Sequence, residues 1–232
     1  MKSFQLFNDF ISLFYPEVCL CCGESLSGQE EFICTSCMYR LPKTNFHLRS
    51  ENELMNVFWG RADIKAAAAY CYFQKGNPVQ VLVHELKYHG KKELGIYLGK
   101  WYGHELKQST VFESAEVVIP VPLHKKKLKR RGYNQSAFFA RGLAESMGLI
   151  CLEDSLFRLV DTTTQTRKTK GARWENVKEI FRVADKEALV GKHILLVDDI
   201  ITTGATVEAC IHPLAEIPVA SVSVASIGYA SF

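Results

Sequence analysis

One segment near the C-terminal end restricts the possible fold more than any other. Residues 193–206 read HILLVDDIITTGAT, which is an aliphatic run, two adjacent aspartates and a turn rich in threonine. An aliphatic run as short as Ile194 to Val197 is typical of a strand buried on both faces of a parallel sheet. Ligands of open α/β sheets bind outside the carboxyl ends of the strands. We therefore expect the strand to stop at Asp198 and Asp199 and to present them to a ligand.

The turn that follows the two aspartates is expected to open a helix. A helix N-terminus offers free backbone N–H groups and the positive end of its dipole, which suit a phosphate group. The two carboxylates accept hydrogen bonds and therefore suit neutral hydroxyls. A ribose 5-phosphate carries both kinds of group. The predicted ligand-binding residues are Asp198, Asp199, Thr202, Thr203, Gly204, Ala205 and Thr206.

Two other interpretations of this segment are weaker. A Walker B strand also ends in an acid, but it requires a Gly-x-x-x-x-Gly-Lys-Ser/Thr loop, which this sequence lacks. An ordinary strand, turn and helix would leave the acids merely solvated. The pattern of four hydrophobic residues, two acids, two spacers and Thr-Thr-Gly-x-Thr instead resembles the phosphoribosyl pyrophosphate (PRPP) signature of type I phosphoribosyltransferases. The resemblance implies a parallel α/β sheet flanked by helices and a PRPP ligand with Mg²⁺.

Composition limits the remaining possibilities. The 232 residues are 47% hydrophobic and 23% charged, which fits one main domain plus a small appendage. A net charge of +3 is too small to indicate a nucleic-acid partner by itself. The sequence has no 18-residue apolar span, and Asn8 and Asp9 interrupt the apolar residues at the N-terminus. We therefore expect no transmembrane segment and a cytoplasmic location.

Four of the eight cysteines have the spacing of a metal site. Cys19 with Cys22, and Cys34 with Cys37, form two Cys-x-x-Cys pairs separated by eleven residues. Such pairs present four thiolates to one tetrahedral Zn²⁺, and a closed site of this kind is structural. Cys21 leaves an alternative open, because it could replace Cys19 or Cys22. Disulfides are disfavoured in a reducing cytosol, and a redox site normally has a single Cys-x-x-Cys.

A dense basic segment follows a second predicted strand, Val117 to Ile119. Six of the seven residues from Lys125 to Arg131 are cationic. Such a run is either a solvated face or a place where negative charges bind. In the phosphoribosyltransferase fold, the loop after the corresponding strand holds pyrophosphate, and a polar segment such as Asp161 to Arg173 forms a flap. The predicted catalytic cations are Lys125, Arg131, Arg167 and Arg173.

Further blocks narrow the resemblance to the ComF family. They are PVPL at residues 120–123, RGYNQ at 131–135, and LFR, TQT, an arginine, NV and a phenylalanine between 156 and 181. The cysteine pairs also fit the longer members of that family. The resemblance implies a cytosolic phosphoribosyltransferase-like protein linked to natural competence, with single-stranded DNA and competence proteins as possible partners.

The predicted organisation is an N-terminal helix and zinc-binding region at residues 1–45, followed by a phosphoribosyltransferase-like domain at 46–232. A first strand is expected at 66–73, with helices at 79–88 and 93–106. If the protein is active, a nucleophile displaces pyrophosphate from PRPP, but no residue identifies the acceptor. The alternatives are a nucleotide-salvage phosphoribosyltransferase and a non-catalytic module that senses PRPP and contacts DNA or partners.

Overall fold

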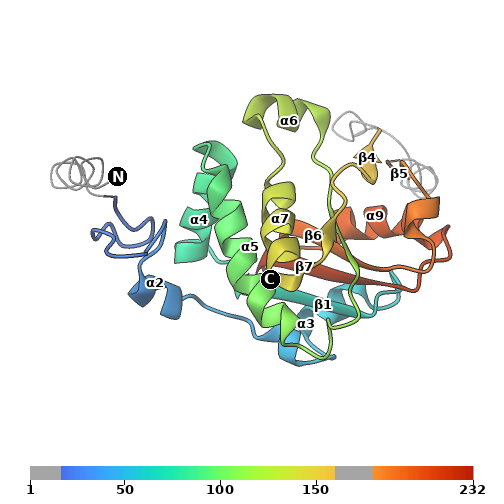
Figure 1. Cartoon of the computed structure of the whole chain (residues 1–232), viewed down its shortest axis with the longest axis horizontal. Coiled ribbons are helices and arrows are strands. Elements are labelled where there is room, and N and C mark those ends of the chain that lie inside the picture. Colours follow the sequence, from blue (N-terminus) through green and yellow to red (C-terminus); the bar gives the residue numbers. More distant parts are fainter. Residues whose placement is uncertain (1–16, 160–179, 232) are drawn as a thin grey trace.

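The computed structural model describes residues 17–159 and 180–231 (Figure 1). The predicted N-terminal helix lies outside these residues, as does the whole predicted flap with Arg167 and Arg173. Among the described helices, none is both long and apolar enough to cross a membrane.

A five-stranded parallel sheet forms the centre of the molecule, in the order β1-β7-β6-β2-β3. The predicted α/β fold class is therefore confirmed. β6 lies in the middle and is long enough to pair with both neighbours. The strands are β1 (Ala66–Tyr72), β2 (Val117–Pro120), β3 (Ile150–Cys151), β6 (His193–Ile201) and β7 (Ser221–Tyr229).

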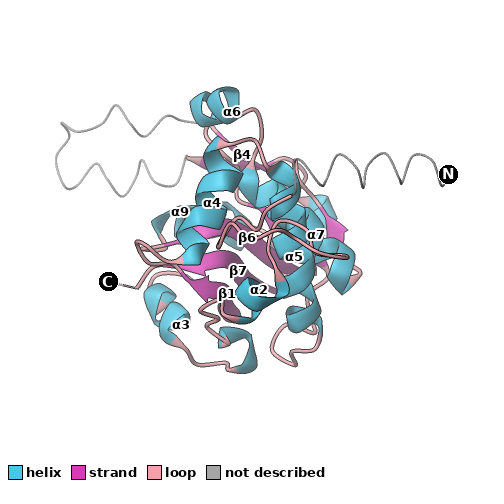
Figure 2. Ribbon diagram, turned by 90° about the vertical axis from the view of Figure 1, so that its left-hand side faces the viewer, coloured by secondary structure: helices cyan, strands magenta, loops and turns pink. Residues whose placement is uncertain are grey.

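Helices cover the sheet on both sides, with α7 and α9 on opposite sides of the strands (Figure 2). α7 contacts β2 and β6, whereas α9 contacts β6. The helices are α2 (Thr35–Tyr39), α3 (Glu53–Phe58), α4 (Pro78–Tyr88), α5 (Lys92–Lys107), α6 (Lys125–Arg131), α7 (Gln135–Met147) and α9 (Ala205–Ala215), with 3₁₀ turns η1 (Phe46–Leu48) and η3 (Glu187–Leu189). The predicted strand at 66–73 and the two helices at 79–88 and 93–106 correspond to β1, α4 and α5.

α5 and α7 approach each other closely because both carry glycine at their contact. A Cβ atom added to Gly142 would lie 2.9 Å from the Cα of Gly99. The absence of side chains at these two positions therefore lets the two backbones pack together, which fixes α7 against the sheet.

β6 continues past the point where the sequence predicted its end. The two aspartates lie inside the strand, and Asp198 pairs with Ser226 of β7. On its other edge β6 pairs with β2 only as far as Val197, opposite Pro120. The prediction that the strand stops at the carboxylates was therefore wrong. β7 supplies backbone partners beyond them, while the end of β2 leaves one side open.

The basic segment is a helix rather than the predicted loop. α6 consists of lysine, arginine and one leucine, all residues with good helix propensity. The side chain of His124 accepts a hydrogen bond from the N–H of Lys126 at 3.2 Å, and Gly132 ends the helix at a φ of +82°. Cations in its last turn also interact favourably with the helix dipole.

β4 (Leu156–Arg158) and β5 (Phe181–Val183) form a separate antiparallel pair. The two strands bracket residues 160–179, to which the predicted flap belongs. Near the other predicted boundary, the residues just before position 45 pair with β1: the N–H of Thr44 donates to Tyr70 O, and that of Tyr72 to Pro42 O. The division at residues 45 and 46 remains a prediction.

Candidate ligand and metal sites

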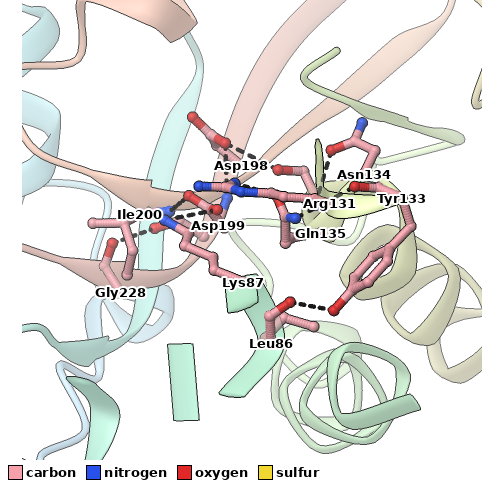
Figure 3. Close-up of polar contacts among 12 residues, drawn as sticks. Leu86, Lys87, Arg131, Tyr133, Asn134, Gln135, Asp198, Asp199, Ile200 and Gly228 are labelled. Atoms are coloured by element: carbon pink, nitrogen blue, oxygen red, sulfur yellow. Dashed lines mark hydrogen bonds and ion pairs between the residues drawn. The ribbon is translucent and has the colours of Figure 1, made fainter. Parts of the chain in front are cut away.

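The two aspartates of β6 have different neighbours (Figure 3). One carboxylate oxygen of Asp198 accepts hydrogen bonds from Ser136 Oγ at 3.0 Å and from the N–H of Asp199 at 2.8 Å. Asp199 is only 9% exposed, and its Oδ2 lies 2.8 Å from the Nζ of Lys87. The first acid is therefore held from the N-terminus of α7 and the second from the last turn of α4.

Burial and the nearby Asp199 carboxylate raise the pKa of Asp198 to about 7. Desolvation disfavours the charged form, and a second negative charge adds to that penalty. Lys87 neutralises part of the charge of this acid pair. The acid pair is thus suited to bind hydrogen-bond donors, because donors such as sugar hydroxyls stabilise the charged form of a carboxylate.

The turn after β6 has the form that the sequence predicted. Gly204 takes a left-handed conformation, with a φ of +71°, and precedes the first residue of α9. Among the described residues, no group accepts a hydrogen bond from the backbone N–H groups of residues 203–206. Asp198 and the turn line one small pocket of about 40 Å³. Free N–H groups and a helix N-terminus therefore lie beside a carboxylate, as binding of a phosphate with a neighbouring hydroxyl requires.

Lys87 is the site residue that the sequence did not assign. It lies in the segment Leu86–Gly90, which resembles a family block, but a single lysine is indistinguishable from a solvated one. The hydroxyl of Tyr133 donates to the backbone oxygen of Leu86 and thereby fixes the end of α4 (Figure 3). Only this packing brings Lys87 to Asp199.

Of the two predicted cations on α6, the structure brings Arg131 to the site and leaves Lys125 exposed at the start of the helix. Arg131 donates to Gln135 Oε1 at 2.7 Å, and its guanidinium lies 5.2 Å from the centre of the Tyr88 ring. Its Nε is buried and has no hydrogen-bond partner among the described residues. A buried donor of this kind is normally satisfied by a water or a ligand.

The PVPL segment (residues 120–123) and the RGYNQ segment (residues 131–135) are in contact in the structure. Asn134 caps α7 by accepting from the N–H of Ser136, and its Nδ2 donates to the backbone oxygen of Val121 at 3.0 Å. The residue next to this cap, Gln135, is fully buried. These contacts place Ser136 at Asp198, so the two blocks form one wall of the site.

The four cysteines predicted as metal ligands come together in one cluster. The Sγ atoms of Cys19, Cys22, Cys34 and Cys37 all lie within 4.8 Å of one another. Cys21, the alternative ligand, lies outside this cluster. Gly23, at a φ of +77°, allows the turn after the first pair. The cluster can hold a metal ion.

The pKa values of the thiols do not separate the cluster from Cys21, because burial also raises the pKa of Cys37 within the cluster. Burial raises the pKa of Cys21 to about 12, so this thiol stays protonated. Burial also acts on Cys19, but backbone N–H groups that donate to its sulfur outweigh that effect and lower its pKa to about 6. One of these donors is the N–H of Cys34, at 3.3 Å. Thiolates are the form that binds metal.

Comparison with known proteins agrees with this geometry. Residues 134–229, which include α7, β6 and the turn, match the family model described as phosphoribosyl transferase domain. Similar solved structures include the "allosteric regulatory enzyme of purine biosynthesis" (TM-score 0.44, 20% identity, 62% of this chain and 30% of that chain) and a hypoxanthine phosphoribosyltransferase from Staphylococcus aureus (TM-score 0.35, 17% identity, 58% and 62%). The parallel α/β sheet and the domain match over residues 134–229 together indicate a phosphoribosyltransferase-like fold.

Curated relatives narrow the class. DNA utilization protein YhgH of Salmonella typhimurium is 32% identical over 133 residues, 56% of this chain and 58% of the relative. YhgH of Escherichia coli K12 is 27% identical over 194 residues, 82% and 80%, and Competence protein F of Haemophilus influenzae is 28% identical over 134 residues, 56% and 58%. The first of these alignments thus spans less than two thirds of the relative. The relatives and the domain match agree with the resemblance of the chain to the ComF family of phosphoribosyltransferase-like proteins.

Proposed function

We propose that the chain binds PRPP as its magnesium complex at the C-terminal part of β6. The observation that carries the proposal is that Asp198 lines one small pocket together with a turn whose N–H groups have no acceptor among the described residues. Asp198 and Asp199 accept hydrogen bonds from the ribose hydroxyls. The turn from Thr202 to Thr206 binds the 5′-phosphate through its N–H and hydroxyl groups.

The cations have a separate role at the other end of the ligand. Arg131, whose Nε has no partner in the described part of the chain, donates to the diphosphate, and Lys125 adds positive charge from the start of α6. Arg167 and Arg173, on the segment outside the described residues, belong to the same proposal. Magnesium would enter with PRPP, with the carboxylates of Asp198 and Asp199 nearby, and would neutralise part of the charge of the ligand. Lys87 forms an ion pair with Asp199 and holds its carboxylate in place to accept a ribose hydroxyl.

Catalysis requires displacement of pyrophosphate by a nucleophile, and positioning and charge neutralisation supply most of the acceleration. Turnover of isotopically labelled PRPP, with and without candidate bases, separates a transferase from a PRPP-binding module. Release of pyrophosphate with an acceptor supports the transferase, including a salvage enzyme. Binding without turnover for any acceptor supports sensing instead.

The names of the relatives suggest the process. Because they are called DNA utilization protein and Competence protein F, we propose that this chain acts in the cytoplasm in the uptake and processing of transforming DNA. Zinc in the four-cysteine cluster then stabilises the N-terminal region, which is a surface for competence proteins. A four-thiolate site has no open position for a substrate, so its role is structural.

A second candidate activity, contact with single-stranded DNA, is favoured by α6. The helix carries six cations, buries none of its residues, and projects from the body of the molecule (Figure 1). A helix that contributes nothing to the core is free to contact phosphates along a strand. The cations of α6 are thus suited either to bind diphosphate or to bind single-stranded DNA. Substitutions on α6 distinguish the two activities.

Replacing Lys126, Lys127, Lys129 and Arg130 by glutamine is expected to weaken single-stranded DNA binding and to flatten its salt dependence. Each lost phosphate contact lowers the slope of log K against log salt by about 0.7. Fluorescence anisotropy at several salt concentrations measures both quantities. A control variant with the same charge change carries glutamine at four exposed lysines elsewhere, Lys75, Lys100, Lys107 and Lys186, and should bind as the wild type does. Salt-independent binding would contradict the proposal.

A further inference from the structure

Arg61, which follows α3, reaches the turn that we assign to the 5′-phosphate. Its Nη1 donates to the backbone oxygen of Thr203 at 2.8 Å, and its Nη2 forms an ion pair with Glu208 on α9. The same Nη1 also donates to the backbone oxygen of Val57 at 3.1 Å. One guanidinium thus connects α3, the turn and the first turn of α9.

α3 also contacts the turn directly. Gly204 has no side chain, and a Cβ atom added there would lie 2.8 Å from Val57 Cγ1 and 2.9 Å from Phe58 Cε1. Phe58 is buried, so this surface cannot move aside easily. Side chains of α3 therefore pack closely against one side of the turn, while Arg61 holds the backbone of the turn through the Thr203 oxygen.

The hydrogen bond to Thr203 fixes a direction as well as a position. In a planar trans peptide the carbonyl oxygen and the following N–H point in opposite directions. Because the oxygen of Thr203 points to Arg61, the N–H of Gly204 points away from it. That N–H belongs to the group of donors left free at the turn.

We propose that Arg61 is a positioning residue that holds the N–H of Gly204 toward the 5′-phosphate. The inference deepens the proposed PRPP site and rests on it. It adds a residue outside the segment that matches the phosphoribosyl transferase domain, which begins at residue 134. The region before that segment then contributes to ligand affinity through the turn.

Calorimetry on the full chain tests the effect on the ligand. Arg61→Met should raise the Kd for ribose 5-phosphate about tenfold, because a misdirected N–H loses a charge-assisted hydrogen bond. The Kd for pyrophosphate, which lacks the 5′-phosphate, should not change. Arg141→Met is the matched control, because it removes another exposed arginine that pairs with a glutamate, Glu153. It should leave both values unchanged.

A second measurement does not depend on the ligand. ¹⁵N relaxation of the Gly204 amide, without ligand, should show greater mobility in Arg61→Met than in the wild type or in Arg141→Met. If the relaxation of the Gly204 amide is unchanged in Arg61→Met, Arg61 does not hold the turn. If the affinity for ribose 5-phosphate is unchanged, Arg61 has no positioning role. If the wild type binds no ribose 5-phosphate, the proposed site itself fails, and the relaxation then decides whether Arg61 holds the turn.

Discussion

Replacement of both aspartates, Asp198→Asn with Asp199→Asn, is expected to abolish PRPP binding. Each carboxylate accepts a charge-assisted hydrogen bond from a ribose hydroxyl, and such a bond contributes about 1.5–3 kcal/mol. Losing both should raise the Kd about 100-fold or more. Calorimetry with magnesium present measures the change. Asp154→Asn, an exposed acid outside the site, should bind PRPP as the wild type does.

The same substitution should not destabilise the fold. The pKa of Asp198 is raised to about 7 from an ordinary value of 3.8, so the folded chain binds this proton more tightly than the unfolded chain. The stability associated with the raised pKa is therefore present below about pH 4 and is lost as the pH rises toward 7. Asn carries no charge at either pH and can still accept from Ser136.

Asp198→Asn alone is consequently expected to raise the free energy of unfolding by about 1–2 kcal/mol at pH 8, and by much less at pH 4. Thermal unfolding at the two pH values measures the difference. Asp199→Asn should lower the free energy of unfolding instead, because it removes the partner of Lys87.

An unchanged PRPP affinity in a folded double variant would contradict the site assignment. A stabilisation that is independent of pH would show that the Asp198 pKa is not raised.

The second large effect concerns the cysteine cluster. Cys34→Ser with Cys37→Ser should reduce the bound zinc from one ion per chain to none. Residues 17–41 contain a five-residue helix, α2, and one isolated bridge, Val18 to Ser25, so they have little regular secondary structure of their own. Binding of zinc supplies much of the folding free energy of such small regions, about 10 kcal/mol or more in isolated zinc-finger peptides.

Elemental analysis and hydrogen exchange test this prediction together. In the double variant the amides of residues 17–41 should lose protection, while those of the sheet keep theirs. Cys21→Ser is the control, since this thiol lies outside the cluster. Zinc retained by the double variant, or lost from Cys21→Ser, would contradict the assignment.

Features that depend on neighbouring residues could be predicted from the sequence. The aliphatic residues before Asp198 fix a buried strand, and Gly204 permits the left-handed turn before α9. The two Cys-x-x-Cys turns needed only their local spacing to form a cluster. The parallel sheet was expected from the short buried run Ile194 to Val197 and from the resemblance to type I phosphoribosyltransferases.

Features that depend on distant residues could not be predicted. Lys87 reaches Asp199, and Arg61 reaches Thr203, only because of how α4 and α3 pack. Nothing in either local sequence distinguishes these cations from solvated ones. The extension of β6 likewise depends on β7, whose length is not visible in the sequence of β6. The helix at Lys125–Arg131 was not predicted, because like charges in one run repel one another, and the helix propensity of lysine, arginine and leucine outweighs that repulsion.

The central claim is that PRPP binds with its ribose on the aspartates and its 5′-phosphate on the turn. A crystal structure of the full chain with PRPP and magnesium tests it most directly. The account predicts the ribose hydroxyls at Asp198 and Asp199, the 5′-phosphate at the N–H groups of residues 203–206, and the diphosphate toward Arg131. PRPP bound elsewhere, or with its 5′-phosphate on α6 and the turn empty, would contradict it.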